Sequence, residues 1–118
     1  MFRDLFSSKN SPVNLDAEIF EKQLKDDINA LLIDVRTTGE NKGARIPGSV
    51  LIDISRPDFI DEIEKLDRNK SYYVYCHSGS RSYHASKKMK QMGFENVYNL
   101  AEGIISWEGE LEYSKKAR

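Results

Sequence analysis

The chain of 118 residues is poor in several features, and each scarcity excludes a class of protein. It has one cysteine, Cys76, so no disulfide can form within the chain, and with two histidines it offers too few ligands for a zinc site. No apolar run approaches the roughly 18 residues of a membrane span. The segment before Pro12 carries Asp4 and no continuous apolar stretch, which argues against a secretory signal. We therefore expect a cytoplasmic protein with no membrane partner.

The charge is balanced, with 18 basic and 19 acidic residues and a net charge of −1. Such a chain has no global basic field, so nucleic acid is not an expected partner. The hydrophobic fraction of 39% suits one modest core, and the length suits one domain. We find no internal repeat or linker. We expect a flexible arm over residues 1–12, a single domain over 13–112 and a solvated tail over 113–118.

Short apolar runs alternate with helical patterns along the chain. The runs predict buried strands at 30–34, 49–54, 71–75 and 96–100. Helices are predicted after Asp16, at about 58–66, at about 80–92 and around 104–107, with a loop or short helix broken by Pro47 and Gly48. Alternation of this kind implies crossover connections, and so an α/β fold with a parallel sheet and helices on both faces.

Cys76 comes directly after an apolar strand, in the stretch "YVYCHSGSRS". Ligands of parallel sheets bind beyond the carboxyl ends of the strands, so the thiol lies where the fold forms its crevice. Gly79 permits a tight curve, and the N–H groups of such a loop can converge on an anion at the start of a helix. Together with the charge of Arg81, this favours a thiolate at Cys76 with a pKa below the ordinary value.

Each candidate also has a simpler interpretation. A lone cysteine at a strand end can be a buried structural residue. His77 is more readily a solvated loop residue than a catalytic base. Asp34 ends a strand and Arg36 follows two residues later, a spacing that an ordinary surface ion pair would also have.

Three segments, in this order, resemble the signatures of single-domain rhodaneses, the thiosulfate sulfurtransferase-like domains. "LIDVRTTGENKGARIPGS" resembles the first signature, a strand ending in Asp-Val-Arg and a loop closing on Ile-Pro-Gly. "YVYCHSGSRS" resembles the active-site loop, and "MGFENVYNLAEGIISW" resembles the closing segment. The resemblance covers residues 13–109 and implies a parallel sheet of about five strands.

The resemblance also implies roles for particular residues. Cys76 corresponds to the catalytic cysteine of the family. The substrate-binding positions would be the loop residues and the Asp and Arg of the first signature: His77, Ser78, Gly79, Ser80, Arg81, Asp34 and Arg36. Arg45 stands where many family members have histidine, and we expect it near the mouth of the site, where its charge would attract an anionic donor. Departures from the family pattern at Ala44-Arg45, Asn41 and Glu102 bear on the rim of the pocket and on substrate preference.

We therefore expect a sulfurtransferase in which Cys76 takes a sulfane sulfur from thiosulfate or another persulfide donor, and passes it to cyanide or a thiol. The thiol acceptor can be a small molecule or a cysteine of a partner protein. No metal or cofactor is required. Two alternatives stay open: a phosphatase or arsenate reductase on the same fold, and a non-catalytic binding or persulfide-carrier module. Phosphatases of this fold place five residues between the cysteine and the arginine, whereas here the four residues from His77 to Ser80 intervene.

Overall fold

The computed structural model describes residues 11–114 and contains one sheet of five parallel strands. In chain order the strands are β1 (Val13–Leu15), β2 (Ala30–Asp34), β3 (Val50–Leu51), β4 (Ser71–Tyr75) and β5 (Asn96–Leu100). In space their order is β1-β5-β4-β2-β3, so β4 lies at the centre. The expected α/β fold with about five parallel strands is confirmed.

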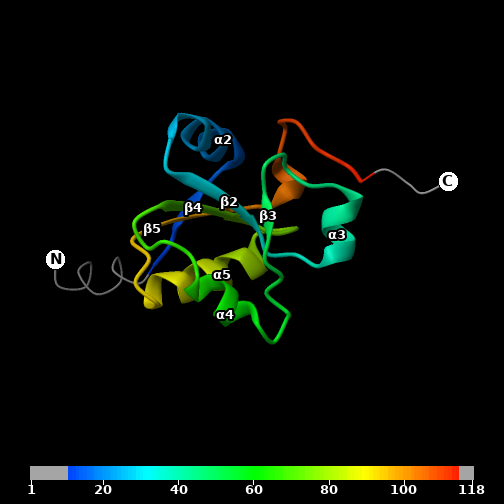
Figure 1. The fold of residues 1–118 in the computed structure, drawn as a ribbon. Coiled ribbons are helices and arrows are strands. Elements are labelled where there is room, and N and C mark those ends of the chain that lie inside the picture. The colour runs from blue at the N-terminus through cyan, green and yellow to red at the C-terminus, as the bar shows by residue number, and fades with distance from the viewer. Residues whose placement is uncertain (1–10, 115–118) are drawn as a thin grey trace.

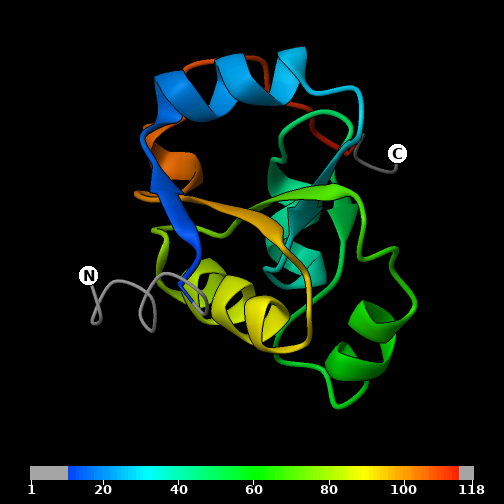
Figure 2. The ribbon, with the colours of Figure 1, turned by 90° about the vertical axis from the view of Figure 1, so that its left-hand side faces the viewer.

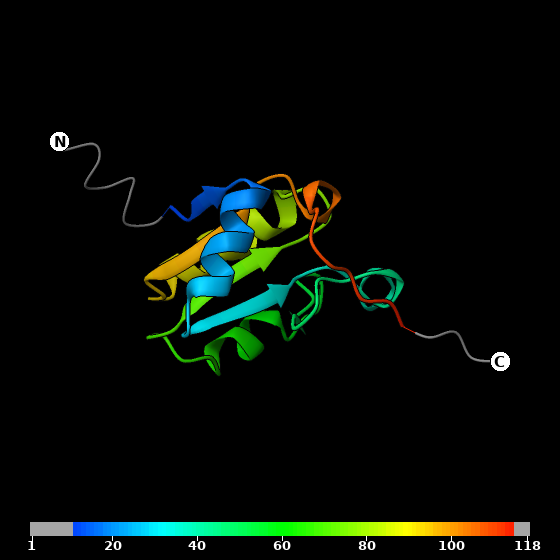
Figure 3. The same ribbon diagram turned by 90° about the horizontal axis from the view of Figure 1, so that it is seen from above.

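Helices cover both faces of the sheet, as expected. Helix α2 (Ala17–Asp26) packs on one face, and α4 (Phe59–Glu64) and α5 (Ser80–Gln91) pack on the other (Figures 1 and 2). Helix α3 (Thr38–Gly43) and the 3₁₀ turn η1 (Ile104–Ser106) lie beyond the carboxyl ends of the strands (Figure 3). Parallel strands with crossover helices therefore leave one edge of the sheet open to loops.

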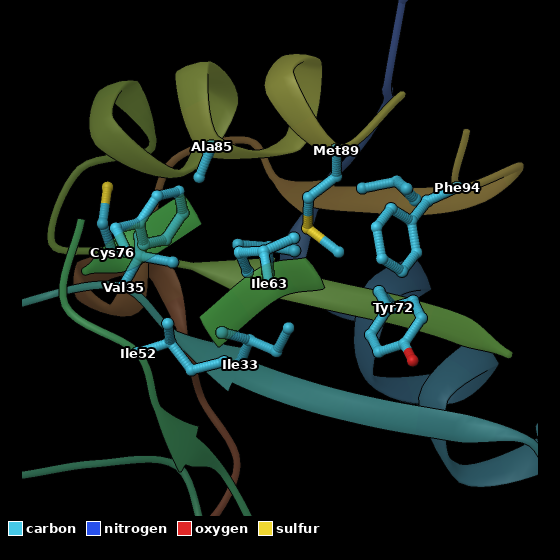
Figure 4. Packing of buried hydrophobic residues seen from close by; sticks show 12 residues of the cluster. Ile33, Val35, Ile52, Ile63, Tyr72, Cys76, Ala85, Met89 and Phe94 are labelled. Carbon is cyan, nitrogen blue, oxygen red and sulfur yellow. The ribbon is translucent and has the colours of Figure 1, made fainter. Parts of the chain in front are cut away.

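Two hydrophobic clusters fill the space between the sheet and its helices. The cluster under α4 and α5 includes Tyr72, Val74 and Cys76, and the cluster under α2 includes Tyr73 and Tyr75. Successive residues of β4 alternate between these faces, as the period of a strand requires. Cys76 continues this alternation. It lies at one end of its cluster, below the first turn of α5 (Figure 4).

The sequence signals for the helix ends are confirmed. The Asp16 side chain accepts a hydrogen bond from Ile19 N at 3.0 Å and caps α2. Helix α5 ends before Gly93, which has φ of 102°, and Phe94 N donates back to Met89 O at 3.1 Å. The α5 helix, whose first residues belong to the cysteine loop, is thus fixed at its far end.

Two predicted elements are shorter than the sequence suggested. The strand expected over 49–54 is limited to Val50–Leu51, because β3 is an edge strand that pairs only with the last two residues of β2. The final helix is a single 3₁₀ turn, and Ile105 is exposed rather than buried. Its first N–H groups are used by the carbonyls of Cys76 and His77, and the chain is extended again at Trp107.

Most of the expected arm and tail, residues 1–10 and 115–118, lies outside the described residues. Inside them, Pro12 is buried and Ser114 N donates to Lys42 O at 3.1 Å. None of the helices within residues 11–114 combines the length and the apolar character needed to cross a membrane.

Candidate active site

The sulfur of Cys76 is the point on which the loop after β4 converges. Gly79 N donates to Sγ at 3.1 Å, Ser82 N donates at 3.3 Å, and the Ser82 hydroxyl lies 3.3 Å away. The cysteine is 1% exposed, so these donors rather than water surround the sulfur. An anionic sulfur at this position is therefore stabilised by hydrogen bonds from the loop and the first turn of α5.

The balance of effects lowers the pKa of the Cys76 thiol below its ordinary value. Burial is the largest influence and opposes ionisation. It is outweighed by hydrogen bonds from the Ser82 hydroxyl and from the amides of Ser82, Gly79 and Ser78. The direction agrees with the sequence expectation, and the loop amides contribute as expected. The charge of Arg81 is not among these main causes.

Two glycines allow the cysteine loop to pack directly on the backbone that follows β5. A Cβ at Gly79 would collide with the carbonyl oxygen of Ala101, and a Cβ at Gly103 would collide with that of His77. Both glycines have positive φ, 102° and 76° respectively. This close packing lets Ile104 N donate to Cys76 O at 2.9 Å and so fixes the start of the loop.

Both backbone polar groups of Gly79 are hydrogen-bonded. Its N–H faces the sulfur, while its carbonyl accepts Asn99 Nδ2 at 3.2 Å and the Ser82 hydroxyl at 3.2 Å. Asn99 lies on β5, is 1% exposed, and also donates to Asn14 Oδ1 at 2.9 Å. Strands β1 and β5 thereby help to hold Gly79, the residue whose amide points at Cys76.

The end of β2 carries a closed ion pair. Arg36 donates to both carboxylate oxygens of Asp34, at 2.9 and 2.8 Å, and to Ala44 O at 2.6 Å. Asp34 Oδ2 also accepts from the Tyr75 hydroxyl at 3.1 Å and from Asn41 Nδ2 at 3.0 Å. Asp34 is fully buried and Arg36 is 4% exposed, so both charges are engaged within the protein. Burial is the largest influence on Arg36 and lowers its pKa, but the hydrogen bond and the charge of Asp34, with a smaller contribution from Tyr75, outweigh it, so the pKa is raised.

Arg81 points to α3 rather than to the sulfur. Its two terminal nitrogens donate to the two carboxylate oxygens of Glu40, each at 2.9 Å. Glu40 is also bound by Thr37, whose amide donates to Oε1 at 3.0 Å, in a capping box at the start of α3. The loop arginine is therefore neutralised by a carboxylate from a neighbouring helix.

The structure brings most of the sequence candidates together, but in two groups. Residues 77–81 surround Cys76, with His77, Ser78 and Ser80 exposed on the outer side of the loop. Asp34 and Arg36 form the separate network at the end of β2. Arg45 contacts Glu112 and Ser114 instead, at 3.3 and 3.1 Å, and so joins α3 to the C-terminal segment.

Three residues of the site were not among the sequence candidates. Ser82 supplies two donors to Sγ, Glu40 pairs with Arg81, and Asn99 holds the Gly79 carbonyl. Glu40 had a usable signal, because Thr37 and Glu40 have the spacing of a capping box. No local sequence pattern predicts the contact of Asn99 with Gly79, since the two residues are 20 positions apart in the chain.

Known proteins share this fold and these segments. The Rhodanese-like domain family matches residues 16–110. The putative sulfur carrier protein YrkF of Bacillus subtilis is 36% identical over 112 residues, which cover 90% of this chain and 57% of that protein. A sulfurtransferase of Allochromatium vinosum is 35% identical over 94 residues, covering 79% of this chain and 85% of that protein.

A crystal structure of a rhodanese-like domain protein from Staphylococcus aureus aligns with a TM-score of 0.76 at 24% identity, over 87% of this chain and 99% of that one. That likeness concerns the fold. The family match covers the cysteine loop, both flanking signatures and the strands that carry them. The resemblance noted in the sequence is confirmed, and the chain belongs to the rhodanese-like domain family.

Proposed function

We propose that the protein is a sulfurtransferase in which Cys76 carries a sulfane sulfur as a persulfide. The observation that carries the proposal is the convergence of Gly79 N, Ser82 N and the Ser82 hydroxyl on Sγ. Such donors stabilise a thiolate before the reaction and a negatively charged persulfide after it. The names of the relatives, a sulfurtransferase and a putative sulfur carrier protein, support the same class.

With thiosulfate as donor, the chemistry needs no cofactor. The Cys76 thiolate attacks the outer sulfur, a new S–S bond forms at Sγ, the S–S bond of thiosulfate breaks, and sulfite leaves with the electron pair. In the second half-reaction cyanide or a thiolate attacks the outer sulfur of the persulfide and regenerates the Cys76 thiolate. Because the chain has one cysteine, the acceptor must come from outside, as a small thiol or a cysteine of a partner protein.

A phosphatase activity is less well supported. The ring between Cys76 and Arg81 contains four residues, and its amides already converge on a single sulfur atom. Arg81, which a phosphate would need, is bound by both of its terminal nitrogens to Glu40. The site therefore suits a sulfur atom better than a tetrahedral anion.

A reducing compartment such as the cytoplasm suits a reactive free thiol.

The test is the intact mass of the protein after incubation with thiosulfate and removal of the excess donor. We expect a gain of one sulfur atom that is reversed by cyanide. Cys76→Ser is the matched control, since the two side chains are similar in size, and it should fold normally and gain no sulfur. Sulfur loading without turnover to cyanide or small thiols, but with transfer to a cysteine of a partner protein, would indicate a carrier. A wild-type protein that gains no sulfur from any sulfane donor would refute the proposal.

A further inference from the structure

The pair formed by Arg81 and Glu40 spans the gap between the cysteine loop and α3. Each terminal nitrogen of the guanidinium meets its own carboxylate oxygen at 2.9 Å, a two-point geometry that favours one orientation. The two side chains are only 39% and 32% exposed. The pair is therefore better ordered than an ion pair between freely solvated side chains.

Glu40 is fixed from behind as well. Thr37 N and the Thr37 hydroxyl both contact Oε1, at 3.0 and 3.1 Å, and Glu40 N donates to the Thr37 hydroxyl at 3.2 Å. The hydrogen bond from Arg81, followed by those from Thr37, lowers the pKa of Glu40 to about 2, against the opposing effect of burial. The carboxylate thus stays charged and stays in place over the whole neutral range.

Arg81 is close enough to the reaction centre for its charge to matter. It is the fifth residue after Cys76 and lies between Ser80 and the sulfur-binding Ser82. The Glu40 hydrogen bond is the largest cause of the raised pKa of Arg81, and the charge of an ionised Cys76 adds to it. A donor with a charged group beside the loop would therefore meet a neutral pair rather than a free cation.

We propose that Glu40 is a specificity-determining residue that withholds the Arg81 charge from the donor, so that the site favours singly charged sulfane donors over doubly charged thiosulfate. The proposal rests on the sulfurtransferase function proposed above. Thiosulfate and methanethiosulfonate test it well, because both give the same Cys76 persulfide. Attack on the outer sulfur breaks one S–S bond in each, and releases sulfite from the dianion or methanesulfinate from the monoanion.

The informative variant is Glu40→Gln. Glutamine can keep the capping box with Thr37 and can still accept one hydrogen bond, but it no longer neutralises Arg81. We expect the ratio of kcat/KM for thiosulfate to that for methanethiosulfonate to rise about fivefold at low salt, the size of a partly exposed charge interaction. The gain should shrink at high salt, where such charges are screened.

The matched control is Glu64→Gln. Glu64 Oε1 pairs with Arg68 NH2 at 2.7 Å, so this variant also removes one carboxylate from an arginine. Arg68 stacks over Phe94, which lies at the opposite end of the core cluster from Cys76 (Figure 4). The donor ratio should not change in this variant, although the net charge changes equally.

The double variant Glu40→Gln, Arg81→Gln tests whether the released charge of Arg81 causes the change in the donor ratio. If released Arg81 attracts the dianion, the double variant returns to nearly the wild-type ratio. A gain that persists without Arg81 would overturn the proposal, because the carboxylate would then act by direct repulsion.

A ratio in Glu40→Gln equal to that of wild type or of Glu64→Gln would also overturn the proposal, while leaving the sulfurtransferase function standing. A wild-type protein that accepts sulfur from neither of these donors would overturn the specificity proposal. It would overturn the sulfurtransferase function as well only if no other sulfane donor loads Cys76.

Discussion

Strands β2 and β4 are neighbours in the sheet, and the polar residues at their carboxyl ends have different roles. At the end of β2 the charges of Asp34 and Arg36 are buried, and the pair is bound on several sides by Tyr75, Asn41 and the Ala44 carbonyl. At the end of β4 the donors point at one atom, the sulfur of Cys76, which still has chemistry to perform. The polar groups at the end of β2 satisfy one another and so stabilise the fold. Those at the end of β4 stabilise an anionic sulfur that can still react.

The strongest test of this contrast is Arg36→Ala. Removing one partner of a buried ion pair should destabilise the protein by about 3 to 5 kcal/mol, because the buried Asp34 side chain would lose the guanidinium that compensates it. Urea unfolding measures the loss, and sulfur loading per folded molecule should change little. The exposed Arg56 pair offers the control, since Arg56→Ala should leave the unfolding midpoint nearly unchanged. Normal stability with a raised KM for thiosulfate in Arg36→Ala would instead give Arg36 the binding role that the sequence suggested.

The next test concerns the backbone contact that supports the loop. Gly93→Ala should cost about 1 kcal/mol, since φ is positive there but no atom of the described part of the chain would crowd the added Cβ. Gly103→Ala carries the same kind of backbone strain and adds a clash with the His77 carbonyl, so it should be less stable and lose most of its sulfur loading. Paired thermal melts and mass measurements compare the two. Equal stability and equal loading in the two variants would mean that the contact does not position the loop.

A smaller effect is expected from Ser82→Ala. Loss of the hydroxyl should raise the pKa of Cys76 and slow sulfur loading at neutral pH about tenfold, the usual size of a hydrogen bond to a charged group. Ser86, one turn later on α5, is also buried, but its hydroxyl finds no hydrogen-bond partner among residues 11–114. Ser86→Ala should therefore load sulfur at the wild-type rate. Equal rates in the two serine variants would argue against a contribution of the Ser82 hydroxyl.

The smallest effect is expected from Arg45→Ala. Arg45 is paired with Glu112 and its side chain is 24% exposed, so its attraction for an anionic donor should be weak. We expect a rise of less than about twofold in KM for thiosulfate, visible at low ionic strength only. Steady-state kinetics at two salt concentrations measures it. A large, salt-dependent rise in KM would show that Arg45 attracts the donor at the mouth of the site, as the sequence suggested.

The sequence predicted the framework of the fold well, because its signals are local. The apolar runs at 30–34, 71–75 and 96–100 match β2, β4 and β5, and the helix expected at 80–92 matches α5. The final helix failed, since its N–H groups are used by the cysteine loop. The edge strand β1 was not predicted, because three residues carry too little pattern to identify a strand.

The sequence also predicted the nucleophile and its loop, but not the partners that come from afar. Arg81 was expected to add its charge to the loop beside Cys76, and the structure pairs it with Glu40, 41 residues earlier. The two residues meet only after folding, because it is the fold that brings α3 next to the cysteine loop at the carboxyl ends of the strands. Arg36 was expected at a substrate-binding position, and its burial against Asp34 depends in the same way on Tyr75 and on the Ala44 carbonyl.

The most direct test of the account is the rate of alkylation of Cys76 by iodoacetamide as a function of pH. The thiolate is the reactive form, so the rate rises as the pH passes the pKa of the thiol. We predict an inflection clearly below the value of about 8.5 for a free thiol, and an upward shift in Ser82→Ala but not in Ser86→Ala. An inflection at or above the free-thiol value in the wild-type protein would contradict the claim that the loop activates Cys76.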